Sequence, residues 1–440
     1  MNTKATRRLM DVTSLCGAAL IIATAAYADT TPAPATPATT APAAPAAAPA
    51  TPPPAYGKLT VTGLFDGYYQ VAFSKQKSAA AGADAASLAS SPSASSFGNV
   101  PLAYAYVKSG GVFGGGYGAG ALYTVNQATP TLSLAEANLT VLAAPGGFGW
   151  KATLGAGDTA DFGNVVPGGS EQRYKNFLQL YGTYAFAGTA GGALDFGKFY
   201  TPFGYEVTES NANFNYTRST TYQLLPAYHT GFRLTLPSEK GFTVAGYLVN
   251  ALYNSAYEGV SSENSSPAVI GQIAYADPAN KYNLVETIGG GTDRPYGYDV
   301  KSTLSDTDLT FNLSTADTLG LNYTYLNQKP SLPGAAGLAS EKTVTSGYGI
   351  YFKKQLNPIN AIALRYDGYQ AKTDAGNGLS SAQYKPYDIT ATYEIKSSTQ
   401  WLTRLEYRYD GANVAVYTDS DGNVTKKNQS ELIASEVFTF

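Results

Sequence analysis

Apolar and polar side chains alternate along the segment that begins at Lys58. One parity is mostly apolar and contains Leu59, Val61, Phe65, Tyr69, Val71 and Phe73. The other parity is mostly polar and contains Thr60, Thr62, Asp66, Tyr68, Gln70 and Ser74. Because successive side chains of a β-strand point to opposite faces of the sheet, this pattern predicts an amphipathic strand.

The same alternation returns near the other end of the chain, in the segments 384–396 and 399–410. In the first of these, Tyr387 and Ile389 alternate with Asp388 and Thr390. A soluble antiparallel sandwich and a membrane barrel both alternate in this way, so the pattern alone leaves the two folds open.

Strand lengths and connections favour the barrel, because many segments are about ten residues long, as a tilted bilayer-crossing strand requires. Tight turns are predicted at Ala144–Gly147, Asp277–Asn280, Thr315–Thr318 and Asn357–Asn360. Longer polar loops are predicted at Asn254–Pro267, Gly291–Leu304, Lys329–Lys342 and Ala412–Gln429. Short periplasmic turns that alternate with longer outer loops characterise outer-membrane barrels.

These signals predict an all-β fold in residues 58–440, a single transmembrane antiparallel β-barrel of about eighteen strands. The strands are expected to begin near Lys58, Val100, Tyr117, Leu132, Phe148, Lys175, Ala193, Tyr228, Phe242, Ala268, Tyr282, Ser305, Leu319, Thr343, Ile359, Gln383, Thr399 and Ser430. The glycine-rich candidate near Tyr117 is the weakest, so a count of about sixteen strands is the alternative.

Charged residues occur on the polar faces of the predicted strands, at Asp66, Arg365, Asp367, Arg404, Glu406 and Arg408. A barrel of this size is too wide for side chains alone to fill, so these faces predict a water-filled lumen. The six residues are therefore the candidate pore-lining positions. Their mixed signs leave the ion selectivity open.

The chain ends in LIASEVFTF, which has the pattern of a last strand. Phe438 and Phe440 fit its outward parity, and aromatic side chains concentrate at the boundary between membrane and water. A terminal strand that ends in Phe resembles the signal by which outer-membrane barrels are recognised for assembly. These two residues are the candidate assembly signal, whereas Glu436 interrupts the apolar parity.

The first 28 residues predict a secretory signal peptide, because Lys4, Arg7 and Arg8 precede a short apolar run and an A-x-A cleavage motif that ends at Ala28. Residues 29–57 are rich in Ala, Pro and Thr. Proline removes backbone donors and fixes φ, so this segment predicts an extended periplasmic tether without a core. The tether is interpreted either as a contact with peptidoglycan or as a flexible leader.

Composition argues against several classes of function. Charged residues make up 14% of the chain and its net charge is −3, without the basic block that nucleic-acid binding needs. The single histidine, His229, cannot form a multi-histidine metal site. The sequence contains no Gly-x-Ser-x-Gly motif and no complete phosphate-binding loop. We expect no cofactor, no metal site and no catalytic residue, and a hydrolase with His229 as its base is the least favoured alternative.

The central segment carries more specific motifs: Gly197-Lys198-Phe199, Thr201-Pro202-Phe203-Gly204-Tyr205-Glu206, Asn215-Tyr216-Thr217-Arg218-Ser219 and Tyr228-His229-Thr230-Gly231. These motifs resemble the OmpL-like family of β-barrel porins, most specifically over residues 197–236 and more weakly from residue 130 to residue 440. The resemblance implies an outer-membrane pore, and the solutes of that family are largely undefined.

The connection 204–227 lies between two predicted strands, yet it contains many aromatic and apolar side chains. We expect it to fold into the barrel mouth, pack on the wall and narrow the lumen, because loops of this length are often functional. Glu206, Glu209 and Arg218 would then place opposed charges at the constriction, and such charges set ion preference in pores. A surface loop with its own compact aromatic cluster is the alternative.

The sequence thus predicts a porin in the outer membrane of a Gram-negative bacterium, through which small hydrophilic solutes or ions diffuse. Its expected partners are these solutes, outer-membrane lipid and the barrel-assembly machinery, and a homo-oligomer is left open. A receptor or adhesin barrel with surface-exposed binding loops is the alternative function. The transported solute is not specified by the sequence.

Overall fold

The computed structural model describes residues 56–72, 131–157, 159–160, 176–188, 191–237, 239–253, 267–293, 299–331, 342–374, 382–414, 417–418 and 424–440 of the chain. The predicted signal peptide, most of the predicted tether and the candidate strands near Val100 and Tyr117 lie outside these ranges. The remaining predicted strands all fall within them.

Sixteen strands form the wall of a closed antiparallel barrel in the described part of the chain. They are β1 Leu59–Ala72, β2 Thr131–Val141, β3 Phe148–Ala156, β4 Phe177–Ala185, β5 Ala193–Tyr200, β6 Tyr228–Pro237, β7 Phe242–Val249, β8 Ala268–Ala276, β9 Tyr282–Asp293, β10 Asp299–Asn312, β11 Asp317–Ser331, β12 Lys342–Gln355, β13 Asn360–Asp374, β15 Pro386–Lys396, β16 Trp401–Ala412 and β19 Asn428–Thr439. Three short strands accompany them, namely β14 Ala382–Tyr384, β17 Tyr417–Thr418 and β18 Val424–Lys426.

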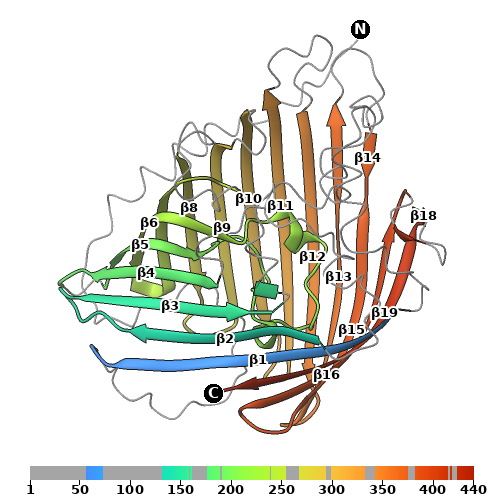
Figure 1. The fold of residues 1–440 in the computed structure, drawn as a ribbon, viewed down its shortest axis with the longest axis horizontal. Coiled ribbons are helices and arrows are strands. Elements are labelled where there is room, and N and C mark those ends of the chain that lie inside the picture. Colours follow the sequence, from blue (N-terminus) through green and yellow to red (C-terminus); the bar gives the residue numbers. More distant parts are fainter. Residues whose placement is uncertain are drawn as a thin grey trace.

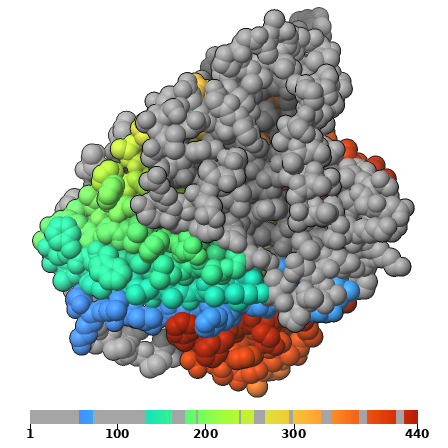
Figure 2. Space-filling model, viewed as in Figure 1, coloured from blue at the N-terminus to red at the C-terminus, as the bar shows by residue number. Residues whose placement is uncertain are grey.

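Each wall strand pairs with its neighbour in the chain, and β19 returns to pair with β1 and close the ring (Figure 1). In the space-filling view, β1 to β5 lie side by side in chain order, and the C-terminal strands adjoin β1 (Figure 2). Since β1 pairs directly with β2, the wall closes with sixteen strands, the lower of the two counts that the sequence left open.

Short connections at one end of the barrel follow β2, β4, β6, β8, β10, β12 and β15. The connections at the other end are mostly longer, as expected for a barrel with short periplasmic turns. The predicted loop Gly291–Leu304 has bounds that are too wide, because β9 continues to Asp293 and β10 begins at Asp299. Glycine and polar residues suggested a loop there, but Gly291 is a strand residue, and a Cβ at this position would lie 2.7 Å from the Cβ of Ala268.

The two faces of the strands differ as their sequence pattern predicts. Phe65, Leu364 and Leu405 point outward and are 54%, 47% and 53% exposed. Asp66 and Glu406 point inward and are fully buried. A broad outward apolar surface of this kind suits contact with hydrocarbon rather than water. Among the described residues, no helix is both long and apolar enough to cross a bilayer.

The C-terminal residue lies at the seam of the barrel. The backbone N–H of Gly63 donates to the Phe440 carbonyl at 2.9 Å, and the Phe440 N–H donates back at 3.0 Å. The Phe440 ring lies 6.1 Å from the ring of Phe65 on the outward face. Glu436 also points outward, where the Trp401 indole N–H donates to its carboxylate at 2.7 Å. This hydrogen bond satisfies the carboxylate that interrupts the apolar parity.

The interior of the barrel is occupied by residues 201–227, which leave β5 and return to β6 (Figure 1). This segment, called the inner loop below, contains two 3-10 turns, η2 Ser210–Ala212 and η3 Thr221–Leu224. Glycines on the wall make room for it: a Cβ at Gly289 would meet the Phe203 ring at 3.0 Å, and a Cβ at Gly320 would overlap the Tyr205 ring. The wall and the inner loop are therefore shaped to fit each other.

Candidate functional site

The inner loop is attached to one side of the barrel by a buried network of charges. Arg365, on β13, donates through Nη1 to Glu206 of the inner loop at 2.9 Å and through Nε to Asp388 of β15 at 3.0 Å. Its other contacts include the Thr217 carbonyl. Asp367 accepts the backbone N–H of Thr221 at 2.8 Å. Each charge thus has partners, as buried ionic groups require.

A second group of contacts lies on β16. The Glu406 carboxylate accepts the backbone N–H groups of Tyr216 at 2.6 Å and Thr217 at 3.0 Å. Arg404 donates to the carbonyls of Ser210 at 2.6 Å and Asn213 at 2.7 Å. The wall side chains therefore bind the backbone of the inner loop and satisfy polar groups that the loop could not satisfy by itself.

Two further contacts complete the attachment. Arg408 donates to the carbonyl of Arg218 at 2.6 Å, and Asp66 on β1 accepts the Ser210 hydroxyl at 2.6 Å. The Arg218 guanidinium turns back onto its own loop, where Nη1 donates to the Tyr216 carbonyl at 2.9 Å. The inner loop is thus fixed both to the wall and to itself.

The six sequence-predicted pore-lining side chains all face the barrel interior. They are 0–1% exposed because the inner loop covers them. Their contacts are with this loop, with one another and with further charged residues of the wall, which makes them attachment points in this structure. Glu206, Glu209 and Arg218 all belong to the inner loop, but Arg218 and Glu206 are buried in its contacts, and Glu209 lines the open space described below.

Sequence reasoning missed several members of this network, among them Asp388, Glu394 and Asp410. Asp388 bonds Arg365, Glu394 pairs with Arg404 at 2.9 Å, and Asp410 pairs with Arg408 at 2.7 Å. Each of the three lies on the polar parity of its strand, so the alternation that identified Arg404 and Arg408 also carried the signal for them.

Aromatic side chains reinforce the attachment of the inner loop. The Tyr205 ring stacks on Tyr351 of β12 with centroids 4.4 Å apart, and Tyr216 and Phe203 are 0% and 2% exposed. Burial raises the pKa of the Tyr205 and Tyr222 hydroxyls, both on the inner loop, above the usual value. These groups therefore stay protonated and act as hydrogen-bonding or packing groups.

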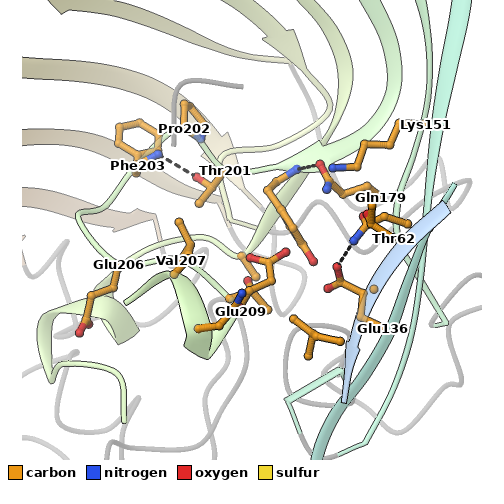
Figure 3. Close-up of a pocket in the computed structure, with 18 of the residues that line it drawn as sticks. Thr62, Glu136, Lys151, Gln179, Thr201, Pro202, Phe203, Glu206, Val207 and Glu209 are labelled. Atoms are coloured by element: carbon orange, nitrogen blue, oxygen red, sulfur yellow. Dashed lines mark hydrogen bonds between the residues drawn. The ribbon is translucent and has the colours of Figure 1, made fainter. Parts of the chain in front are cut away.

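The opposite side of the inner loop borders a cavity of about 470 Å³ (Figure 3). Its wall is contributed by strands from β1 to β8, and the charged side chains in its lining are Glu136, Lys151, Glu206, Glu209 and Arg233. The charged side chains that hold the inner loop thus lie on β13, β15 and β16 and, through Asp66, on β1, and a cavity remains between the loop and the strands β1 to β8.

The basic group on the β6 side of this cavity is already paired. Arg233 donates to Asp195 at 2.7 Å, and its guanidinium lies 5.1 Å from the Tyr181 ring centroid and 5.0 Å from that of Phe199. An arginine with both an ion pair and aromatic neighbours is held in one orientation. Arg233 therefore presents a fixed surface to the cavity.

His229 occupies a structural position at the start of β6. Its Nε2 lies 3.1 Å from the Thr201 hydroxyl and its Nδ1 lies 3.3 Å from the Ala251 carbonyl. The nearby serines of the inner loop have other contacts, since Ser210 donates to Asp66 and Ser219 lies 3.0 Å from the Thr221 hydroxyl. Within the described ranges, no group of three or more His, Cys, Asp or Glu is arranged to hold a metal ion.

The family model Putative beta-barrel porin-2, OmpL-like, matches residues 58–440. The chain belongs to this family. Membership in the OmpL-like family, together with the closed sixteen-strand wall, places the protein among outer-membrane porins of Gram-negative bacteria and points to a channel rather than an enzyme. A comparison with curated proteins finds no match.

Solved structures share the fold of this OmpL-like chain at low sequence identity. The outer membrane channel DcaP of Acinetobacter baumannii has a TM-score of 0.52 at 11% identity, covering 88% of this chain and 98% of its own. OmpT of Vibrio cholerae, in its trimer form, has a TM-score of 0.52 at 10% identity, covering 88% and 100%. An anion-selective porin from Comamonas acidovorans has a TM-score of 0.50 at 10% identity, covering 87% and 99%. At these identities, the similarity concerns the fold alone.

Proposed function

We propose that this protein is a diffusion porin, in which small hydrophilic solutes or ions cross the membrane between the inner loop and the wall from β1 to β8. The observation that carries the proposal is the open space between the inner loop and the strands β1 to β8. Charged side chains of β13, β15 and β16 bind the loop, whereas the cavity of about 470 Å³ is lined by the loop and by residues of β1 to β8.

The lining of this space suits a polar solute. Asn138, Gln179 and Thr62 present amide and hydroxyl groups to it, and such groups replace part of the hydration shell of a passing solute. The volume lies within the range of about 300–1,000 Å³ that small-molecule sites occupy. The inner loop sets the width of the passage, and the outward apolar face keeps the barrel in lipid.

Conductance of the purified chain in planar bilayers tests this proposal. We expect discrete conductance steps in potassium chloride. A variant in which residues 207–224 are replaced by a short Gly/Ser linker should give larger steps, because the passage loses its inner wall. A barrel that is folded by heat-modifiable gel migration but shows no conductance would contradict the proposal and favour a receptor or adhesin.

We also propose that residues 1–28 direct export and are removed, and that residues 29–57 form a periplasmic tether. The supporting observation is the basic, apolar and Ala-x-Ala pattern of the N-terminus. Mass spectrometry of the protein from outer membranes should give an N-terminus at Asp29. An intact N-terminus would contradict the export proposal and would leave the porin proposal standing.

A further inference from the structure

Two carboxylates face each other across the cavity, one from the wall and one from the inner loop. Glu136 lies on β2, and Glu209 directly precedes the 3-10 turn η2. Their side chains line the same cavity and point toward the same space (Figure 3), and the charge of Glu209 acts on the Glu136 carboxyl. Two carboxylates this close disfavour each other's charged form unless a proton or a cation lies between them.

Two oxygen atoms at this point have no hydrogen-bond partner among the described residues. Glu136 is 4% exposed, and Asn138 donates to its Oε1. Its Oε2 has no hydrogen-bond partner among the described residues, and the same holds for the hydroxyl of Tyr200, which lies beside Glu209. A buried polar group without a partner costs about 1–3 kcal/mol. A bound group that donates hydrogen bonds to these two oxygens would remove this cost.

The balance of charges gives the sign of that missing group. Glu206 is paired with Arg365 and Arg233 is paired with Asp195. The charges left in the lining are the two carboxylates and Lys151, which acts on both of them through space. When both carboxylates are ionised, two negative charges and one positive charge leave one negative charge, which one monovalent cation would neutralise.

We propose that Glu136, Glu209 and Tyr200 form a cation-binding constriction, and that the pore prefers small monovalent cations, including primary ammonium solutes, over anions. This inference rests on the proposed porin function. A primary ammonium has three N–H donors, which match one oxygen from each of the three side chains. A tightly held calcium ion is a poorer match, because it takes six to eight oxygen ligands.

Reversal potentials across bilayers that separate unequal potassium chloride concentrations test the inference. We expect the wild type to favour potassium over chloride. The double variant Glu136→Gln, Glu209→Gln should lose this preference severalfold, since both side chains keep their shape and lose their charge. The matched control is Glu286→Gln, because the Glu286 carboxylate accepts the Ser305 hydroxyl at 3.0 Å outside the cavity lining. This control should retain the wild-type reversal potential.

A second readout uses methylammonium chloride in place of potassium chloride on one side of the bilayer. Methylammonium should permeate the wild type, and the double variant should lose that permeability relative to chloride. A conducting wild type without cation preference, or a double variant with unchanged selectivity, would overturn this inference and leave the porin proposal intact. A folded chain that does not conduct at all would overturn both.

Discussion

The Arg365 guanidinium lies 2.9 Å from the Glu206 carboxylate, and the two side chains are 0% and 3% exposed. This pair joins the barrel wall to the inner loop at a point that water does not reach. Because one partner without the other is an uncompensated buried charge, the position of the inner loop depends on this contact more than on any exposed one.

Replacing Arg365 with Ala should therefore release the inner loop. Glu206 and Asp388 would lose their shared cation, at a cost of about 3–5 kcal/mol for breaking a buried pair. We expect a lower unfolding midpoint in urea and larger, noisier conductance steps. The matched control is Lys354→Ala, which breaks an ion pair with Asp317 whose lysine is 50% exposed. Exposed pairs contribute little, so an equal loss of stability in both variants would contradict this account.

The close fit between Gly320 and Tyr205 predicts that a substitution at Tyr205 restores stability lost by a substitution at Gly320. Gly320→Val should overlap the Tyr205 ring, which lies where the new Cβ would be, and overpacking costs about 1–3 kcal/mol. Adding Tyr205→Ala should recover much of this loss because the overlapping ring is gone. Chemical unfolding of both variants measures the effect.

Gly271→Val serves as the control for that experiment, since nothing lies within 4 Å of a Cβ at Gly271. Gly271→Val should change the free energy of unfolding little. A Gly320→Val protein as stable as the wild type, or one that Tyr205→Ala does not improve, would argue against close packing of the inner loop on β11.

The outward face predicts that the loss of stability caused by a charged substitution depends strongly on its depth in the membrane. Leu364, on β13, is 47% exposed, and Leu356, in the turn before that strand, is 46% exposed. Leu364→Lys should destabilise the barrel in lipid vesicles by about 2–4 kcal/mol, the cost of a lysine near the bilayer centre. Leu356→Lys should change the free energy of unfolding little. An equal loss of stability in the Leu364→Lys and Leu356→Lys variants would contradict this prediction.

The C-terminal aromatic predicts an effect on assembly rather than on conduction. Phe440→Ala should reduce the amount of folded protein in the outer membrane, because a terminal Phe resembles the recognition signal of barrel assembly. Phe148→Ala, which removes an 80% exposed aromatic from the start of β3, should leave that amount unchanged. Folded Phe440→Ala barrels should conduct as the wild type does, and quantitative gel migration of membrane fractions measures the yield.

Much of the wall was predictable from sequence because two-residue alternation is a local property of the chain. Predicted starts at Phe148, Ala193, Tyr228, Phe242, Ala268 and Tyr282 coincide with observed strand starts. The number of strands was harder to predict, because the local sequence pattern does not tell whether the glycine-rich segment near Tyr117 is a wall strand. The count of the described wall depends on the pairing of β1 with β2, and this contact joins residues that are far apart in the sequence.

The candidate site was predictable only in part. Parity placed Arg365, Arg404 and Glu406 inside the barrel, but it could not show that the inner loop covers them. The path of a loop through a lumen is decided by contacts such as Glu406 with Tyr216, which join residues from distant parts of the chain. The role of these residues in solute passage stays a prediction.

The seam between β1 and β19 has a consequence for the order of folding. All other wall pairings join strands that are neighbours in the chain, whereas this one joins its two ends and carries the largest loop-closure entropy. Such a pairing forms late. The inner loop contacts β1 through Asp66 and β16 through Arg404, on either side of the seam. Pairing of β1 with β19 and docking of the inner loop therefore stabilise each other, because the loop contacts the wall on both sides of the seam.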